Sequence, residues 1–190
     1  YACPQWDTNL QKAISESDGI NFYYSATMIE PVDSGNKCVS IFNAGRGVDG
    51  FKEQDLIRAL PQLELKDWNG ASWPPSIMHR KMWKKVGGYS EEFSPGLYSD
   101  PDLSMKLWQE GVRDFRGVGN SLVYHFMQKS TGRIVLNNGK AQFLKKWGVS
   151  ASWFNRKVLK LGNPYNGPLP ETGIRPTLKD RLRLMFRPGR

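Results

Sequence analysis

Residues 99–111 read SDPDLSMKLWQEG and predict a helix with a marked start and a marked end. Pro101 suits the first helical position, because its missing N–H would have no partner there. Gly111 is a typical C-terminal stop. The residue before a proline is kept out of the α region, so Asp100 is predicted as the N-cap, with Asp102 in the first turn.

Outward from this helix, apolar residues that recur every three or four positions indicate further helices, and clusters of aromatic and β-branched residues indicate strands. The predicted helices span residues 4–16, 51–60, 76–86, 101–110, 139–147 and 152–161. The predicted strands span residues 22–29, 39–42, 114–118 and 121–126. Pro61 is expected to end the second helix, and residues 162–176 read as a linker. Helices and short strands in alternation favour an α/β fold.

Length and charge limit the classes of protein to which the chain can belong. The 190 residues suit one domain, and no apolar run approaches the roughly 20 residues that cross a bilayer. Residues 1–150 hold 18 basic and 16 acidic side chains, whereas residues 151–190 hold 9 and 2. The nearly neutral body makes nucleic acid an unlikely partner. Two cysteines, Cys3 and Cys38, lack metal-site spacing, and we expect a reducing, cytoplasmic compartment.

Three segments follow one another in a distinctive order: GGYSEEF at 87–93, the stretch at 99–111, and SLVYHF at 121–126. This order resembles family-2 glycosyltransferases of the GT-A fold, in which a G-G-[FY]-x-E-x-F segment leads to an E-D-x-D-L helix and a later strand carries a His. The resemblance covers residues 1–150 and implies the acceptor-side part of a GT-A domain, a mixed sheet flanked by helices. Residues 151–190 are predicted as a helical, basic C-terminal extension.

The resemblance gives Asp100 the role of the base that deprotonates an acceptor hydroxyl, and Asp102 the role of holding the helix start and the acceptor. A plain capping role for Asp100, worth about 0.5–2 kcal/mol, is the alternative. Ser99 departs from the family, which has Glu there, and brings no charge to the acceptor site. Trp73 and Arg80 fall where the family lines the acceptor cleft. Trp73 is either a platform for a sugar ring or a core tryptophan.

His125 matches a position where some members place a metal-ligating His, and the alternative is a His that ends a strand with a satisfied hydrogen bond. Lys129 lies in a segment that resembles the lid over the donor diphosphate, where it would meet a phosphate; an exposed loop lysine is the alternative. The resemblance implies a nucleotide-sugar donor, a carbohydrate or lipid-linked acceptor and a divalent cation, Mn or Mg, with inverting transfer.

The metal carboxylates of the family belong to a D-x-D motif, and the sequence has none before residue 100. The opening residues, YACPQWD, resemble the segment that directly follows that motif. We therefore expect the chain to lack the nucleotide-binding half and to be inactive by itself. A remnant that only folds or associates is the alternative.

Residues 177–186 read TLKDRLRLMF and predict a basic amphipathic helix. Such a helix either lies on an anionic membrane, at the inner membrane face, or docks on its own domain or on a second copy of the chain as a homo-oligomer. The alternative to an enzyme is accordingly a non-catalytic binding module that uses this tail on a membrane surface or on nucleic acid.

Overall fold

The computed structural model describes residues 1–70, 73–95, 97–127, 135 and 137–186. These residues form a curled mixed sheet flanked by helices, so the predicted α/β class is confirmed. The helices are α1 (Trp6–Ser15), α2 (Glu53–Leu63), α3 (Arg80–Val86), α4 (Ser99–Gln109), α5 (Gly139–Trp147), α6 (Ala151–Trp153) and α7 (Leu178–Met185). The strands are β1 (Phe22–Glu30), β2 (Val39–Ile41), β3 (Trp68–Asn69), β4 (Ser76–Met78) and β5 (Asp114–Tyr124).

Strand β1 is the centre of the sheet, whose order is β2-β1-β5-β3, with β4 also paired to β1. It runs parallel to β2 and β5 and antiparallel to β4. Met28 lies opposite Val39 in β2, and Tyr24 lies opposite Ile77 in β4. The strand is buried at eight of its nine residues. A strand covered on both faces needs such a continuous run of strand-forming residues, and FYYSATMIE supplies it.

Strand β5 is one long strand where the sequence predicts two. Val118 pairs with Ala26 and Leu122 pairs with Thr27, so three residues of β5 are extra at this point. Gly119 stands within this irregularity, where an added Cβ would come within 1.9 Å of the carbonyl oxygen of Leu65. The turn-like residues that suggest a break therefore form a bulge inside a continuous strand.

Several predicted helix boundaries differ from the structure, and two of these differences have a clear physical cause. Pro61 lies inside α2, which continues to Leu63, because a proline in the last turn removes only one backbone hydrogen bond. Of the helix predicted over 76–86, only Arg80–Val86 is helical, while Ser76–Met78 forms β4. Pairing with β1 decides the conformation of these three residues, which are too few for a reliable period.

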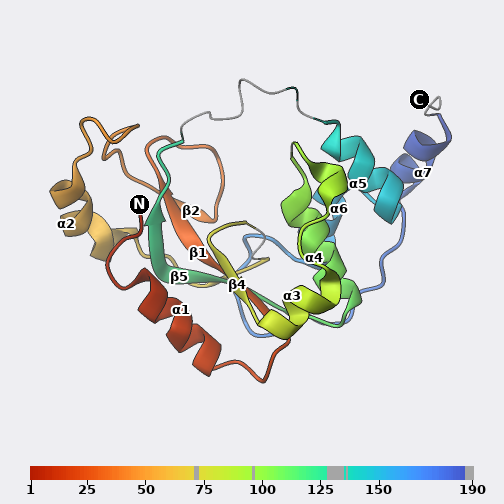
Figure 1. The fold of residues 1–190 in the computed structure, drawn as a ribbon, viewed down its shortest axis with the longest axis horizontal. Coiled ribbons are helices and arrows are strands. Elements are labelled where there is room, and N and C mark those ends of the chain that lie inside the picture. Colours follow the sequence, from red (N-terminus) through yellow and green to blue (C-terminus); the bar gives the residue numbers. More distant parts are fainter. Residues whose placement is uncertain (71–72, 96, 128–134, 136, 187–190) are drawn as a thin grey trace.

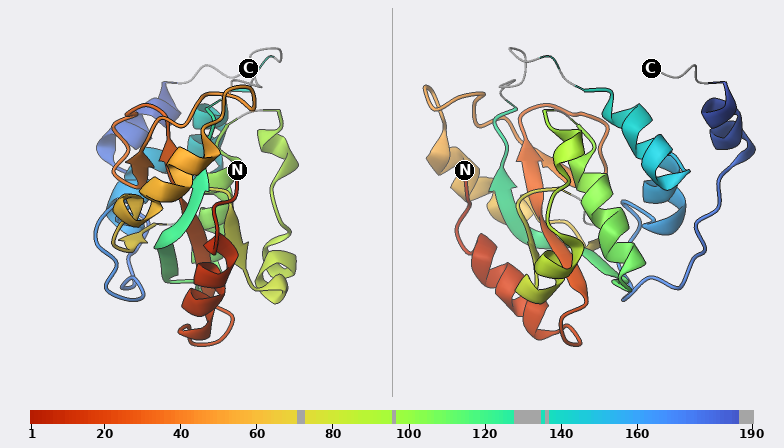
Figure 2. Two further views of the ribbon diagram at one scale, coloured as in Figure 1. Left: turned by 90° about the vertical axis from the view of Figure 1, so that its left-hand side faces the viewer. Right: turned by 45° about the vertical axis from the view of Figure 1, so that its right-hand side comes forward.

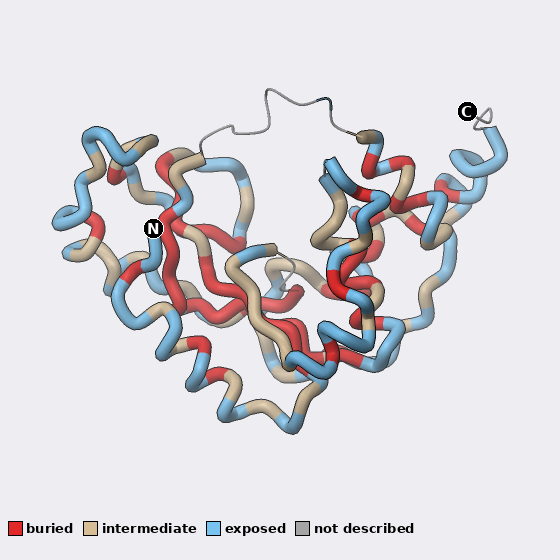
Figure 3. The backbone as a smooth tube through the Cα atoms, viewed as in Figure 1, coloured by how far each residue is buried: buried red, intermediate tan, exposed pale blue. Residues whose placement is uncertain are grey.

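The core continues past residue 150. Phe154, Val158 and Leu159 have 0% exposure and pack in the same cluster as Leu103 and Phe115. The buried residues concentrate in the two long strands and on the inner sides of the helices (Figure 3). The predicted division between 1–150 and 151–190 is therefore not a break in the packing.

The segment predicted as a linker returns to the sheet. The amide of Asn69 donates to the carbonyl oxygen of Asn163 at 2.8 Å, and the amide of Leu169 donates to that of Arg113 at 2.8 Å. In Figures 1 and 2 this segment passes along the sheet before it reaches α7. It is thus an ordered part of the domain.

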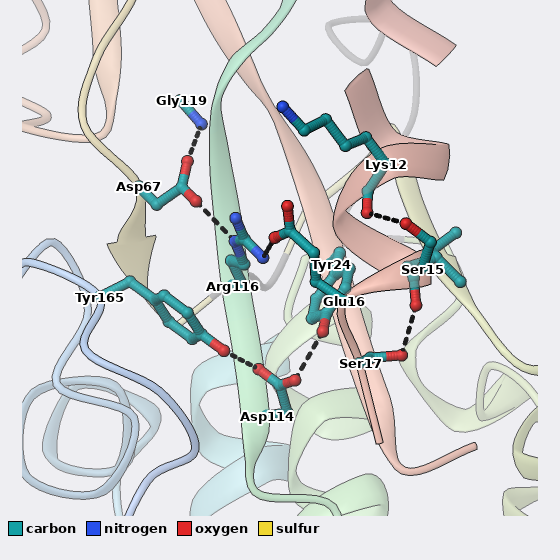
Figure 4. A network of polar contacts seen from close by, with 11 residues as sticks. Lys12, Ser15, Glu16, Ser17, Tyr24, Asp67, Asp114, Arg116, Gly119 and Tyr165 are labelled. Atoms are coloured by element: carbon teal, nitrogen blue, oxygen red, sulfur yellow. Dashed lines mark hydrogen bonds and ion pairs between the residues drawn. The ribbon is translucent and has the colours of Figure 1, made fainter. Parts of the chain in front are cut away.

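Polar contacts tie this segment to the strands (Figure 4). The hydroxyls of Tyr24 and Tyr165 donate to the two oxygens of Asp114 at 2.6 and 2.8 Å. Burial, together with the Asp114 carboxylate, raises the pKa of both tyrosines, so both remain donors at neutral pH. The guanidinium of Arg116 pairs with Asp67 at 2.6 Å and with Glu16 at 2.9 Å.

No helix in the described part of the chain is both long enough and apolar enough to cross a membrane.

Gly117→Ala is expected to destabilise the fold by about 1–3 kcal/mol, because overpacking a filled site forces its neighbours to move. An added Cβ would lie 1.9 Å from Cε2 of Trp68, whose ring stacks on Trp73. Urea denaturation followed by tryptophan fluorescence measures the change. Gly173→Ala is the matched control, because its Cβ would meet nothing within 4 Å. Equal stability of the two variants would contradict this packing.

Candidate functional site

A cleft of about 520 Å³ lies between β4, α3 and Tyr89, which belongs to the segment that joins α3 to α4. Its wall includes Pro74, Pro75, Ile77, Arg80, Trp83 and Tyr89. Trp83 and Tyr89 are each 40% exposed and meet edge to face, with ring centroids 5.6 Å apart. The cleft therefore presents aromatic surface with one exposed guanidinium, that of Arg80, at its border.

A second hollow, of about 280 Å³, shares Pro74 and Pro75 with this cleft and extends to His125. A third hollow, of about 290 Å³, shares Tyr1, Tyr124 and His125 with the second but no residue with the cleft. The second and third hollows lie at the carboxyl end of β5, and the second also includes Met28 of β1. In α/β folds with parallel strands, this end of the sheet is the usual place for ligands.

Asp100 is the second residue of α4 and not its N-cap. Tyr98 occupies the N-cap position with φ 85°, Ser99 is the first helical residue, and no side-chain cap bond forms. The helix therefore begins two residues before Pro101, and the restriction that proline places on its predecessor is overridden here. The capping interpretation of Asp100 loses its geometric basis.

The carboxylate of Asp100 is half-buried beside the cleft. Burial raises the pKa of Asp100, and the hydroxyl of Tyr89, which donates to its Oδ1 at 3.3 Å, partly offsets that rise. Burial and the nearby Asp100 charge raise the pKa of Tyr89 to about 12, so this phenol stays protonated and remains a donor. A carboxylate with a raised pKa is a better proton acceptor than an exposed one.

Asp102 has 0% exposure and makes its contacts within the protein. Its Oδ2 accepts from the Ser90 hydroxyl at 2.7 Å, and its Oδ1 accepts from the indole N–H of Trp147 at 2.8 Å. The ammonium of Lys146 lies 2.9 Å from the same Oδ1. The predicted role in holding the helix start fits these contacts. The predicted contact with an acceptor does not, because the carboxylate has no exposed surface.

Lys146 joins three parts of the chain at this point. Its ammonium lies 3.1 Å from the Ser90 hydroxyl and also pairs with Glu92. Burial by itself would lower the pKa of Lys146, but the carboxylates of Asp102 and Glu92 raise it overall, so the lysine remains charged. Sequence patterns place Lys146 on a helix but do not indicate its contact with residue 102, which depends on packing between helices.

His125 stands at the end of β5 with its side chain 49% exposed. Its Nδ1 lies 3.2 Å from Oε1 of Glu30, and the other oxygen of Glu30 accepts from the Ser34 hydroxyl at 2.8 Å. Within the described ranges, no three His, Cys, Asp or Glu side chains gather in a way that could hold a metal ion. The residues that the structure describes therefore do not form a complete cation site.

The other predicted site residues have different surroundings. Trp73 stacks on Trp68 with centroids 5.0 Å apart and an interplanar angle of 25°, so one of its faces is covered. Arg80 borders the cleft, and Ser99 begins α4. Lys129 lies outside the described residues. Trp83 was not singled out by the sequence, in which it is one of seven tryptophans without a distinguishing pattern.

No family model matches the chain. No match is found among curated proteins. No solved structure matches it either.

Asp102→Ala is expected to lower the free energy of unfolding by about 2–5 kcal/mol, because the indole N–H of Trp147 and the Ser90 hydroxyl both lose their buried acceptor. Denaturant titration measures this loss. Asp55→Ala is the matched control, since Asp55 forms an exposed pair with Arg58 at 3.5 Å and should cost less than about 1 kcal/mol. A small effect at residue 102 would contradict the structural role.

Asp100→Asn is expected to maintain or increase stability at neutral pH. The raised pKa means that the folded chain favours the neutral carboxyl, and Asn is neutral at every pH. As the pH falls through that raised pKa, Asp100 itself becomes protonated and the difference between the two chains should shrink. Thermal melts between pH 3 and 8 measure this trend. Asp7→Asn, at an exposed first-turn carboxylate in α1, is the control. A lower stability of Asp100→Asn at neutral pH would show that the fold favours the charged carboxylate, and it would contradict the raised pKa of Asp100.

Proposed function

We propose that the chain carries the acceptor side of an inverting glycosyltransferase that resembles family 2 and the GT-A fold. Its reaction moves a sugar from a nucleotide-sugar donor to a hydroxyl of a carbohydrate or lipid-linked acceptor. The observation that supports this proposal most is the half-buried Asp100 carboxylate, which has a raised pKa and is hydrogen-bonded to Tyr89 in the wall of an aromatic cleft.

Asp100 would serve as the base. As the acceptor oxygen forms its bond to the anomeric carbon, the hydroxyl proton passes to the Asp100 carboxylate, and the bond from that carbon to the nucleoside diphosphate breaks. Tyr89, which lines the cleft, donates its hydrogen bond to Asp100 and so links this carboxylate to the cleft wall. Asp102 does not react; it is a positioning residue that fixes the first turn of α4 through its buried contacts.

The cleft offers surfaces that a saccharide can use. Trp83 and Tyr89 offer partly exposed rings, and the apolar face of a sugar packs well on aromatic surface. Arg80 supplies N–H donors for hydroxyl or acidic groups of the acceptor. Ser99 brings no charge where the family has Glu, and Asp102 is fully buried, so Asp100 is the carboxylate in the first turn of α4 that remains partly exposed.

The donor side is less complete in this chain. In the family, a divalent cation supplies the charge that neutralises the departing diphosphate when it is bound. Among the described residues, His125 and its partner Glu30 do not suffice to hold such an ion. We therefore propose that this chain binds acceptor saccharides but transfers no sugar by itself.

Saccharide binding by this chain tests the cleft directly. NMR spectra of the tryptophan indole signals, recorded with a panel of mono- and disaccharides, should show shifts at Trp83. Trp83→Ala and Tyr89→Ala should weaken binding at least about tenfold, because each removes a stacking surface. Glu91→Gln, an exposed change in the neighbouring turn, should leave binding unchanged. Failure of every saccharide to bind would contradict the proposal.

A sugar-transfer assay tests the role of Asp100 as the base. In a polypeptide that also provides the donor half, Asp100→Asn should reduce turnover by on the order of 10²–10⁴-fold and leave donor binding unchanged. Retained activity would contradict the assignment of the base. For the present chain, calorimetry with nucleotide sugars and Mn should detect no micromolar binding, and such binding would show that the donor side is complete here.

A further inference from the structure

Helix α7 is well formed although it lies near the end of the chain. The Thr177 hydroxyl oxygen accepts from the amide of Asp180 at 3.1 Å, and the Asp180 carboxylate accepts in return from the amide of Thr177 at 3.3 Å. This reciprocal capping satisfies two backbone donors that would otherwise lack helical partners. Figures 1 and 2 place α7 at the outer edge of the molecule, beside α5.

One side of α7 faces the protein. Asp180 is 1% exposed, and Leu184, four residues later, is 37% exposed, the lowest value among the large apolar residues of this helix. Residues four apart lie on the same side of a helix. The helix therefore packs through the side that carries Asp180, while Leu184 on the same side remains partly exposed.

The opposite side of α7 is apolar and exposed. At about 100° per residue, Leu178, Leu182, Met185 and Phe186 fall within one arc of roughly 100°, which is centred opposite the packed side. Their exposed fractions are 74%, 40%, 67% and 79%. The tail thus docks on its own domain through the side that carries Asp180, and the domain leaves the opposite, apolar face uncovered.

Basic residues border this apolar arc on both sides. Arg181 lies at one margin, and Lys179 and Arg183 lie at the other; all three are exposed. Within the part of the chain that the structure describes, none of them forms an ion pair. The single acidic residue of this helix, Asp180, is buried and occupied in the cap.

We propose that α7 binds the surface of membranes that contain anionic lipids, with its apolar arc among the acyl chains and its cations at the headgroups. Charge complementarity favours this partner: an arc of apolar residues between two cationic margins matches an apolar layer under a negative surface. A second copy of the helix would bring cations against cations, and nucleic acid would leave the apolar arc in water. The inference stands on α7 alone and does not depend on the proposed transferase activity.

Co-sedimentation of the whole chain with vesicles tests the proposal. Binding is expected to vesicles of 70% phosphatidylcholine and 30% phosphatidylglycerol at 50 mM salt, to weaken at least about tenfold at 500 mM salt, and to be much weaker on pure phosphatidylcholine. The combined change Lys179→Gln, Arg181→Gln, Arg183→Gln should lower the partition coefficient roughly 100-fold, because each cation near such a surface contributes about fivefold.

A second variant tests the apolar arc. Leu178→Ser with Met185→Ser and Phe186→Ser should abolish binding and leave the circular dichroism spectrum and melting temperature unchanged, because these side chains contact solvent in the free chain. In Phe186→Trp, the emission of the new indole should shift to shorter wavelength on anionic vesicles. Lys12→Gln, Lys37→Gln and Lys66→Gln, at exposed positions elsewhere, form the matched charge control and should bind as the unmodified chain does.

A partner of α7 other than a membrane would give a different result in these experiments. Sedimentation equilibrium that shows a dimer lost in the triple serine variant, without vesicle binding, would assign the arc to a second copy and overturn the proposal. Binding to a DNA or RNA oligonucleotide that the triple serine variant retains, again without vesicle binding, would overturn it as well. Equal binding to neutral and anionic vesicles would contradict the role of the cations.

Discussion

The buried carboxylate of Asp102 is the constraint on which the candidate site depends. A charge that is fully removed from water is tolerated only with close partners, and this one has Ser90, Trp147 and Lys146. The three partners come from the turn before α4 and from α5. The carboxylate therefore fixes the start of α4 against two other parts of the chain. Asp100, two residues earlier, takes its position beside the cleft from this contact.

Two carboxylates within one turn thus have opposite surroundings. Asp102 is paired with an ammonium and with two neutral donors, whereas Asp100 is desolvated and has one hydrogen bond, from Tyr89. Environments that differ in this way separate a structural carboxylate from one that can exchange a proton. Asp114, at the start of β5, is likewise a structural carboxylate, because two tyrosine hydroxyls hold it. Partners decide the role of each acid.

Local patterns predicted much of the fold. The helices at α1, α4 and α5 and the strands β1 and β2 are where periodicity and strand-forming residues place them. Three errors share one cause. Ser76–Met78 joins the sheet, β5 continues through its bulge, and residues 162–176 pack on the strands, all because of contacts with residues distant in the sequence. Local conformational preferences contribute less free energy than such strand pairing and burial.

The sequence by itself determined the α/β class, the run of β1, the amphipathic character of residues 177–186 and the presence of two acids in the first turn of α4. Only the tertiary structure decided which acid is buried, which aromatic rings line the cleft and which side of α7 faces solvent. The physical reason is that periodicity depends on neighbours along one element, whereas desolvation and charge pairing depend on which elements meet. Asp100 and Asp102 differ in surroundings for that reason, although the sequence shows them as two equivalent carboxylates.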